Sequence, residues 1–396
     1  MGLSGMNAYA KGLDVISNNV ANLNTTGFKE GIASFSNVVS RSGGGATTGS
    51  AGASTSGGGV QVNAESQNFS QGDRQSTNQS LDAALDGNGF FVLERDGQRY
   101  YTRAGQFVLD KDGILTEQIT GARVMMSSEG SSMGALNIDP FRTFPPRATT
   151  EVKLSGNLAR SGTDLPTIPV LEVIDTAGNK QSIKIRFVRN AEDPLLWQVE
   201  VLNAVDVSLG SGALRFNADG TPSADNSPIT ATVTPENLPP FTFTLNFGGA
   251  GSYGGMTSLL NNPASAPNLL KQDGLQFGTF EGANFDERGN LEATYSNQEK
   301  KKIGRLVLAS FDSSGDLTSV GNGMYVTQEG RSPKLSAGME FGLGRVEGGK
   351  LEMSNVELTD QFTTLIILQR GYQACSQMTS VANEMMQQLL SMQSGR

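Results

Sequence analysis

The stretch "LDVISNNVANLNTTGFKE", Leu13–Glu30, begins with the periodicity of a helix and ends as a turn. Its apolar residues continue a stripe from near the N-terminus, with the alternating spacings of three and four that are typical of an amphipathic helix. That stripe comprises Met6, Tyr9, Leu13, Ile16, Val20 and Leu23. Four asparagines, Asn18, Asn19, Asn22 and Asn24, lie in the same stretch although the asparagine amide competes with the helical backbone. The pattern predicts a helix over Leu3–Leu23, with the asparagines on a polar face that is either exposed or met by a partner.

The C-terminal region predicts a second and longer helix. Between Asn355 and Met392 there is no proline, and Gly371 is the one glycine. The heptad-like spacing is carried by Leu365, Leu368, Tyr372, Cys375, Thr379, Ala382, Met386 and Leu389. Helices of about 30 Å and ~55 Å with few charged pairs are marginal alone in water. We therefore expect the two seams to pair with each other and to leave ~25 Å of the longer helix for another partner.

The body of the chain predicts β structure. Glycine is abundant at 49 residues, the charged fraction is 17%, and hairpin turns such as Asp96-Gly97 separate short alternating segments. The stretch Ser40–Gly59 is rich in glycine and serine and predicts a flexible tether. Ten of the 14 prolines lie between Ala148 and Leu270, which predicts a separate inserted β domain.

The expected fold class is α+β and multidomain, with mainly β outer domains and terminal helices packed as a coiled-coil-like inner domain. Residues 1–24 and 355–396 form the expected helical polymerisation domain, and residues 25–70 a flexible hinge. Residues 71–147 and 271–354 form the first β domain, and residues 148–270 the inserted outer β domain.

Composition argues against most enzymes and against nucleic acid. The net charge of −9 would repel a phosphate backbone, and the absence of histidine removes the usual general base and zinc ligand. The lone Cys375 lies on an apolar seam, which is typical of a buried small side chain. The stretch Asp110–Leu115 begins like a calcium loop, but Ile114 and Leu115 occupy positions that require a ligand and a glycine. We expect a hairpin turn there, and no catalytic residue, cofactor or metal.

No apolar run is long enough to cross a membrane as a helix, and the N-terminus lacks the features of a cleaved signal peptide. The chain is therefore expected in the cytosol or exported without a cleavable signal.

Read together, the two ends resemble the family of flagellar rod and hook axial proteins, most closely its hook members. The N-terminal "LSGMNAYAKGLDVISNNVANLNTTGFK" and the C-terminal "SNVELTDQFTTLIILQRGYQACSQMTSVANEMMQQLL" are similar to the paired terminal motifs of that family. The segment "DGNGFFVLERDGQRYYTRAGQFVLDKDGIL" resembles the β domain that hook and distal-rod proteins share.

The resemblance implies a non-enzymatic subunit that polymerises into a curved, flexible tube joining the motor's rod to the filament. It implies that the terminal helices line the tube, and that Asn18, Asn19, Asn22 and Asn24 face neighbouring subunits. The implied partners are other copies, a distal rod protein, a hook–filament junction protein, a hook cap and the flagellar type III export apparatus. Family members are exported without cleavage, and "FSNVV" places Phe35 and Val39 on the family's export gate motif.

Four alternatives stay open. A distal rod protein would share both ends, although rods usually lack an insertion as large as Ala148–Leu270, and junction proteins tend to be longer with more helix. A secreted β-rich adhesin would explain the glycines and turns but not the matched helical seams. A carboxylate-based hydrolase lacks any local pattern in its favour.

Overall fold

The computed structural model describes residues 2–40, 56–63, 66–128, 133–160, 165–259, 264–328, 330–337 and 342–394. The chain forms two compact units. The terminal unit comprises Met1–Pro140, Gly282–Ala293 and Lys301–Arg396, and the inserted unit comprises Phe141–Glu281 and Thr294–Lys300. The fold is mainly β with N- and C-terminal helices that lie against each other, as the sequence predicts.

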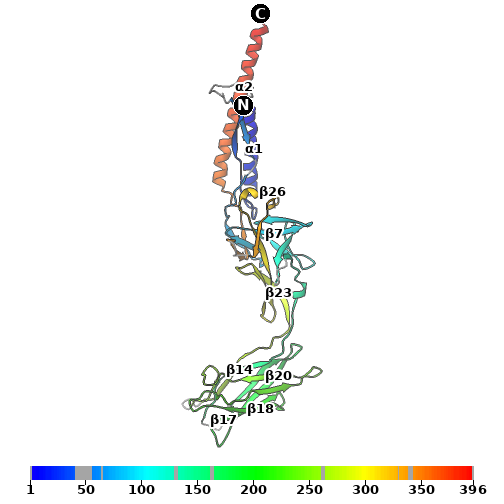
Figure 1. Cartoon of the computed structure of the whole chain (residues 1–396), viewed down its shortest axis with the longest axis vertical. Coiled ribbons are helices and arrows are strands. Elements are labelled where there is room, and N and C mark those ends of the chain that lie inside the picture. Colours follow the sequence, from blue (N-terminus) through cyan, green and yellow to red (C-terminus); the bar gives the residue numbers. More distant parts are fainter. Residues whose placement is uncertain are drawn as a thin grey trace, which may run out of the picture. The chain divides into compact units, whose positions relative to one another are not determined.

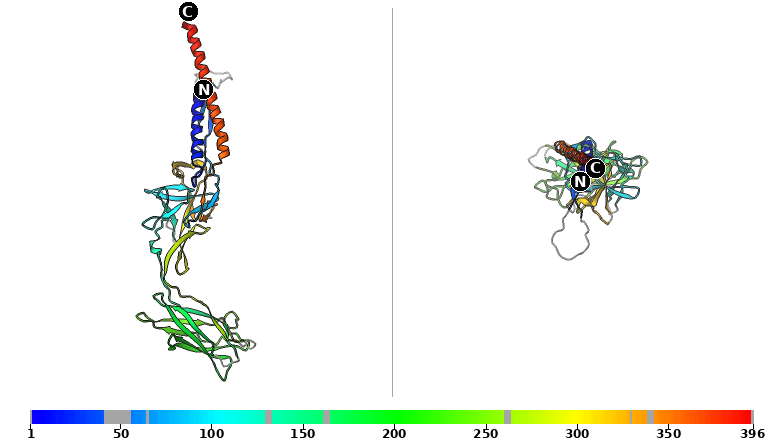
Figure 2. Two further views of the ribbon diagram at one scale, coloured as in Figure 1. Left: turned by 180° about the vertical axis from the view of Figure 1, so that it is seen from behind. Right: turned by 90° about the horizontal axis from the view of Figure 1, so that it is seen from above.

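The two helices of the terminal unit are antiparallel. Helix α1 spans Gly2–Ala21, and α2 spans Leu358–Ser394. The first part of α2 lies beside α1, and its last part continues past the N-terminal end of α1 (Figure 1). The view from behind shows the same arrangement (Figure 2). Within the described residues, neither helix has the continuous apolar length needed to cross a bilayer.

Four short antiparallel strand pairs connect the helices to the main sheet of the terminal unit. The pairs are β1 (Gly31–Ile32) with β4 (Ser66–Gln67), β2 (Phe35–Ser40) with β3 (Ser56–Val62), β5 (Arg74–Ser76) with β30 (Lys350–Glu352), and β6 (Ala83–Asp86) with β29 (Arg345–Gly348). The first two pairs differ from the expected flexible hinge over residues 25–70. The reason is tertiary contact, because Phe35 packs on α1 and thereby holds the hairpin despite its glycines. The predicted tether between Ser40 and Gly59 ends in these strands, and its residues 41–55 lie outside the described ones.

The main sheet of the terminal unit has the strand order β25-β11-β7-β8-β27-β26. These strands are β7 (Phe90–Arg95), β8 (Gln98–Thr102), β11 (Arg123–Ser127), β25 (Lys300–Ser310), β26 (Leu317–Gly321) and β27 (Met324–Thr327). Attached to them are β9 (Phe107–Leu109), β10 (Leu115–Glu117), β12 (Met133–Ala135) and β28 (Lys334–Ala337). The turn between β7 and β8 is the predicted Asp96-Gly97, and both residues have the positive φ that this tight turn requires. Two 3₁₀ turns, η1 (Asp139–Phe141) and η2 (Ser314–Asp316), complete the described helical elements.

The inserted unit contains two sheets that enclose an aromatic core. One has the order β15-β16-β17-β18, with β15 (Thr167–Ile174), β16 (Lys180–Arg189), β17 (Leu196–Asn203) and β18 (Ser208–Arg215). The other contains β14 (Glu151–Asn157), β19 (Ile229–Val233), β20 (Phe241–Asn246), β21 (Met256–Thr257) and β22 (Ala266–Gln272). Strands β13 (Thr143–Phe144), β23 (Gly278–Phe285) and β24 (Asn290–Tyr295) continue the main sheet beyond β25, in the order β13-β23-β24-β25.

The core between the two sheets consists of buried apolar side chains. Trp197, Phe187, Phe216 and Phe243 are fully buried in it. Strand β18 closes against β19 because Gly210 has no side chain, and a Cβ there would collide with the Thr230 carbonyl. Buried and exposed residues alternate along β19 and β20, so one face of each strand packs on the core and the other face is exposed.

Candidate functional site

The helix pair is the candidate site, and its buried seam consists of small residues. On α1 the buried positions are Gly5, Ala8, Gly12, Ile16 and Asn19. This seam differs from the predicted apolar stripe, with which it shares Ile16. The other predicted residues flank the seam and are half-buried, namely Met6, Tyr9, Leu13, Val20 and Leu23. The regular spacing of Gly5, Ala8 and Gly12 is the signal in the sequence that could have identified the seam.

Glycines let the two helices approach closely. A Cβ at Gly5 would lie 2.7 Å from Sγ of Cys375, and one at Gly12 would lie 3.1 Å from a methyl group of Leu368. In the opposite sense, a Cβ at Gly371 would lie 2.6 Å from the ring of Tyr9. Side chains of each helix therefore fill places that glycines leave open on the other, which is the geometry of knobs in holes.

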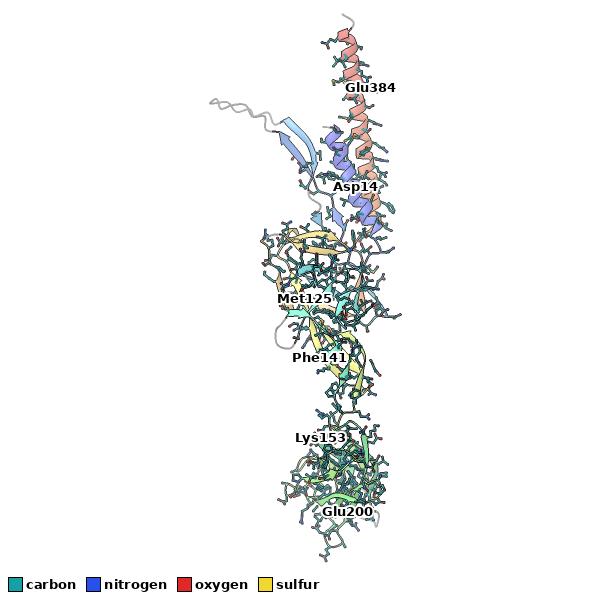
Figure 3. The ribbon with its side chains drawn as sticks, turned by 90° about the vertical axis from the view of Figure 1, so that its right-hand side faces the viewer. Asp14, Met125, Phe141, Lys153, Glu200 and Glu384 are labelled. Carbon is teal, nitrogen blue, oxygen red and sulfur yellow. The ribbon has the colours of Figure 1, made fainter. Side chains whose placement is uncertain are left out.

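The predicted residues of the C-terminal seam fall into two groups. Leu368 is buried, and Leu365 and Cys375 are half-buried along the contact with α1. Tyr372, Ala382, Met386 and Leu389 are exposed. Ala382, Met386 and Leu389 lie on the part of α2 that continues past α1, as Glu384 does in Figure 3. Tyr372 instead lies beside α1, next to the Gly371 that faces Tyr9, but on a side of α2 that α1 does not cover.

Asn19 is the polar member of the buried seam, and its side chain is 0% exposed. Its Nδ2 donates to the carbonyl of Gly31 and to Oε1 of Gln361, both at 2.9 Å. Its Oδ1 accepts the N–H of Gly31 at 2.9 Å. Every hydrogen-bonding position on the amide nitrogen is therefore used within the chain.

The structure corrects the expectation that Asn19 faces a neighbouring subunit, because its amide is enclosed and satisfied inside its own chain. Asn18 and Asn24 are exposed, whereas Asn22 is half-buried. Nδ2 of Asn22 donates to the backbone and side-chain oxygens of Asn18, at 2.9 and 2.8 Å. These three asparagines keep the surface position that contact with another copy requires.

The hydrogen-bond network around Asn19 extends to four segments of the chain. Nε2 of Gln361 donates to Glu30 at 2.8 Å, and Nδ2 of Asn68 donates to the same carboxylate at 3.0 Å. The backbone N–H of Glu30 donates to Oδ1 of Asn355 at 2.8 Å. The end of α1, the start of α2 and the strands between them are thus joined by one polar network.

Lys29, the residue before Glu30 of this network, belongs to a cluster of buried charged side chains. Nζ of Lys29 is 2.6 Å from Oε1 of Glu352, and the side chains of both are 0% exposed. Arg103 contacts the other carboxylate oxygen at 3.3 Å. Burial lowers the pKa of Lys29, and the Glu352 carboxylate opposes that shift. Burial also lowers the pKa of Arg103, so one carboxylate balances two desolvated cations.

The predicted export motif lies beside α1. The ring centroid of Phe35 is 5.9 Å from that of Tyr9, and the ring also lies against Gly12. Val39 belongs to strand β2, and its side chain is outside the described ones. The β2–β3 hairpin stands beside α1 in Figure 3.

The last part of α2 presents an uncovered apolar surface. Every residue with a described side chain from Ser380 onward is exposed, although the sequence there is rich in Met and Leu. The large apolar side chains on this segment, 54–78% exposed, are Val381, Met385, Met386, Leu389, Leu390 and Met392. Contiguous apolar exposure of this kind marks a surface for protein contact. Across the described residues, no cluster of acidic or cysteine side chains has the arrangement of a metal site.

Three protein families match separate parts of the chain. Residues 1–29 match the flagella basal body rod protein family, residues 84–157 match the flagellar hook protein FlgE/F/G D1 domain, and residues 347–392 match the flagellar basal body rod FlgEFG protein C-terminal family. The first and third include most of the helix pair, and the second covers much of the main sheet.

Full-length relatives agree with these matches. The chain is 29% identical to the flagellar hook protein FlgE of Borreliella burgdorferi and 29% identical to that of Escherichia coli, with 98% of each chain covered in both comparisons. The crystal structure of Helicobacter pylori flagellar hook protein FlgE2 has a TM-score of 0.47 at 14% identity, and the comparison covers 70% of this chain and 100% of that one.

Proposed function

Because the chain belongs to the flagellar rod and hook axial protein family, as a full-length relative of its hook proteins, we propose that its helix pair is the element through which hook subunits polymerise. The family consists of structural proteins of the bacterial flagellum, and the hook is an extracellular part of it. The observation that carries the proposal is the uncovered apolar surface of α2 from Val381 to Met392.

Burial of this surface would supply the driving force for assembly. Each large apolar side chain that moves from water into a contact contributes about 1.5–3 kcal/mol. Several such side chains on one helical segment, repeated in every subunit, exceed what a single surface salt bridge provides. The exposed Asn18 and Asn24 and the half-buried Asn22 would add hydrogen bonds to the contact without a large apolar contribution.

The inserted units of neighbouring subunits would allow the tube to bend. A tube that transmits torque while curved must let its outer contacts change in every revolution, which favours polar contacts of modest area. The inserted unit has its own core, so it can move as a body without exposing that core. A closed layer of helix pairs, with inserted units that can separate from one another, fits the role of a flexible joint.

Specific partners follow from the position of a hook between rod and filament. We place a distal rod protein at one end of the tube, a hook–filament junction protein at the other, and a hook cap at the growing end. Export through the flagellar type III apparatus would use Phe35 and Val39 before folding. In the folded chain the ring centroid of Phe35 lies 5.9 Å from that of Tyr9, and the residue stays 41% exposed.

Electron microscopy of the purified protein tests the proposal. We expect short curved tubes from the wild-type chain, and none from Leu389→Asp, which introduces a charge into the apolar surface. Gln388→Asp is the matched control, because it adds the same charge to the neighbouring exposed position and should permit assembly. Wild-type protein that forms no tubes, or Leu389→Asp tubes of normal number and length, would contradict it. An adhesin would instead keep its ligand binding when residues 380–396 are removed.

A further inference from the structure

Exposed methionine is concentrated on the last part of α2. Four methionines there, the α2 methionines, are 59–78% exposed: Met378, Met385, Met386 and Met392. Among the other described methionines, four are at most 6% exposed: Met125, Met126, Met256 and Met324. Met133 on β12 is 46% exposed, and Met6 and Met353 are half-buried. The thioethers most open to solvent are therefore those of α2.

The α2 methionines lie on two neighbouring sides of the helix. Met378, Met385 and Met392 recur at a spacing of seven residues, so they form one line along α2. Met386 is followed three and four residues later by Leu389 and Leu390, with which it shares the next side. A partner that buries the uncovered apolar surface from either side therefore meets at least one thioether.

A thioether differs from the side chain of leucine in its reaction with peroxides. The sulfur attacks one oxygen of hydrogen peroxide, so that an S–O bond forms and the O–O bond breaks. The sulfur is oxidised by two electrons to the sulfoxide, and the peroxide is reduced as its other oxygen leaves as water. Exposure governs which side chains react, and the sulfoxide is polar where the thioether was apolar.

Sulfoxides on α2 would oppose burial of the uncovered surface. In the subunit the S=O groups would be hydrated, because each of these side chains is more than half exposed. In an apolar contact the same groups would lose water without gaining a hydrogen-bond donor, which is costly. Oxidation would thus affect contact with another copy and leave the fold of the subunit intact.

We propose that the α2 methionines form a reversible oxidation site for peroxide, and that their sulfoxides keep a subunit out of the polymer. The oxidation needs only the exposed thioethers, whereas its effect on assembly rests on the proposed function. Methionine sulfoxide reductases would restore the thioethers and with them the ability to assemble.

Peroxide treatment of the full-length subunit, followed by peptide mass spectrometry, tests the site itself. We expect the α2 methionines to oxidise at least about tenfold faster than the buried Met126 and Met256 of the same molecule. A thiol reductant then returns oxidised Cys375, the one cysteine, to its thiol and leaves the sulfoxides. The urea midpoint of the treated subunit should equal that of the untreated one.

Electron microscopy over a series of protein concentrations tests the effect on assembly. We expect treated subunits to need at least about ten times the untreated concentration to form tubes, the factor for losing one apolar contact. Reductases for both sulfoxide stereoisomers should restore the untreated value. Met133→Leu, which removes an exposed methionine outside α2, is the control and should leave the block unchanged. The combined variant Met378→Leu, Met385→Leu, Met386→Leu and Met392→Leu should assemble equally with and without peroxide.

Three results would overturn the oxidation site. The first is oxidation of the α2 methionines no faster than that of Met256. The second is assembly of fully oxidised subunits at the untreated concentration, and the third is a block that persists after reductases restore the thioethers. Untreated subunits that form no tubes would instead contradict the proposed function, while mass spectrometry would still decide whether the site is oxidised selectively.

Discussion

At the scale of single residues, the join between the helix pair and the sheet depends on one buried carboxylate. Glu352 contacts Lys29 at 2.6 Å and Arg103 at 3.3 Å, and its Oε1 also accepts the N–H of Gly72 at 2.9 Å. Its backbone carbonyl accepts the N–H of Gly27 at 2.7 Å. Lys29, Gly72 and Arg103, from three distant parts of the chain, therefore share this one side chain.

We predict that Glu352→Gln destabilises the protein by about 3–5 kcal/mol, because two buried cations lose their carboxylate. Urea unfolding followed by circular dichroism measures the change. The control is Asp312→Asn, which removes an ion pair of similar length, 2.7 Å to Lys334, between exposed side chains. It should cost less than about 1 kcal/mol. Equal losses for the two variants would show that burial of the cluster has no special effect.

Little of this residue-level detail could be predicted from the sequence. Lys29 and Glu352 are far apart in the chain, and a single sequence contains no signal that pairs them. The asparagines drew attention because they are poor helix formers. Which of them is buried depends on the rotation of α1 about its axis. Glycines at the contact set that rotation, and a search for large apolar residues does not include them.

At the scale of elements, one type of hairpin turn recurs. Asp110, Asp175, Asn203 and Asp286 each accept the N–H groups of the second and fourth residues that follow, through one side-chain oxygen. The third residue after each has positive φ. The expectation of a hairpin turn at Asp110–Leu115 is confirmed, because the Asp110 carboxylate accepts hydrogen bonds from backbone N–H groups of the turn itself.

We predict different costs for the same substitution in two of these turns. Asp110→Asn should change stability by less than about 0.5 kcal/mol, because an amide oxygen accepts the same two bonds, as Asn203 does. Asp175→Asn should cost about 1–3 kcal/mol, because its second oxygen accepts bonds from Asn179 and Gln181 that an NH₂ group would oppose. Chemical denaturation measures both, and equal effects would contradict the prediction.

The Asp175 carboxylate also makes stability depend on pH. Burial raises its pKa, but hydrogen bonds from the Gln181 side chain, the Asn179 backbone and side chain, and the Ala177 backbone outweigh this, so the pKa lies below its usual value. Its contribution is present above the unfolded pKa of about 3.9 and is lost as pH falls through the lower folded value. Between pH 6 and pH 2, the melting temperature of Asp175→Asn should fall less steeply than that of the parent protein. An unchanged slope would contradict this.

Elements with strong local signals were predictable, and those fixed by tertiary contact were not. The helices, the Asp96-Gly97 hairpin and strands such as β16 and β20 follow from periodicity and turn residues. The β2–β3 hairpin has a glycine-rich composition that argues against a strand, and its contact with α1 overrides that preference.

At the scale of the whole molecule, we expect the inserted unit to be dispensable for assembly. Arg147 and Leu275 exchange two backbone hydrogen bonds, of 2.9 and 2.8 Å, so the chain enters and leaves at adjacent points. We predict that a chain lacking residues 148–270 still forms tubes with altered curvature, since the helix pair is untouched. Electron microscopy measures curvature, and a deletion variant that folds but forms no tube of any kind would count against a layered assembly.

The family and its general function were predictable from the terminal motifs, because each helix carries its signal in contiguous sequence. The uncovered length of α2 was predictable too, from the difference in helix lengths. The polar network that joins the helices to the strands was not, since it brings together Asn19, Glu30, Asn355 and Gln361 from opposite ends of the chain.

Amide hydrogen exchange of residues 380–394, in the isolated subunit and in the polymer, tests the central claim most directly. The account predicts rapid exchange there in the subunit, where α2 has no partner, and strong protection in the polymer, where other copies cover it. Residues around Leu368, which is buried against α1, should be protected in both states. Equally rapid exchange of residues 380–394 in both states, or full protection already in the subunit, would contradict it.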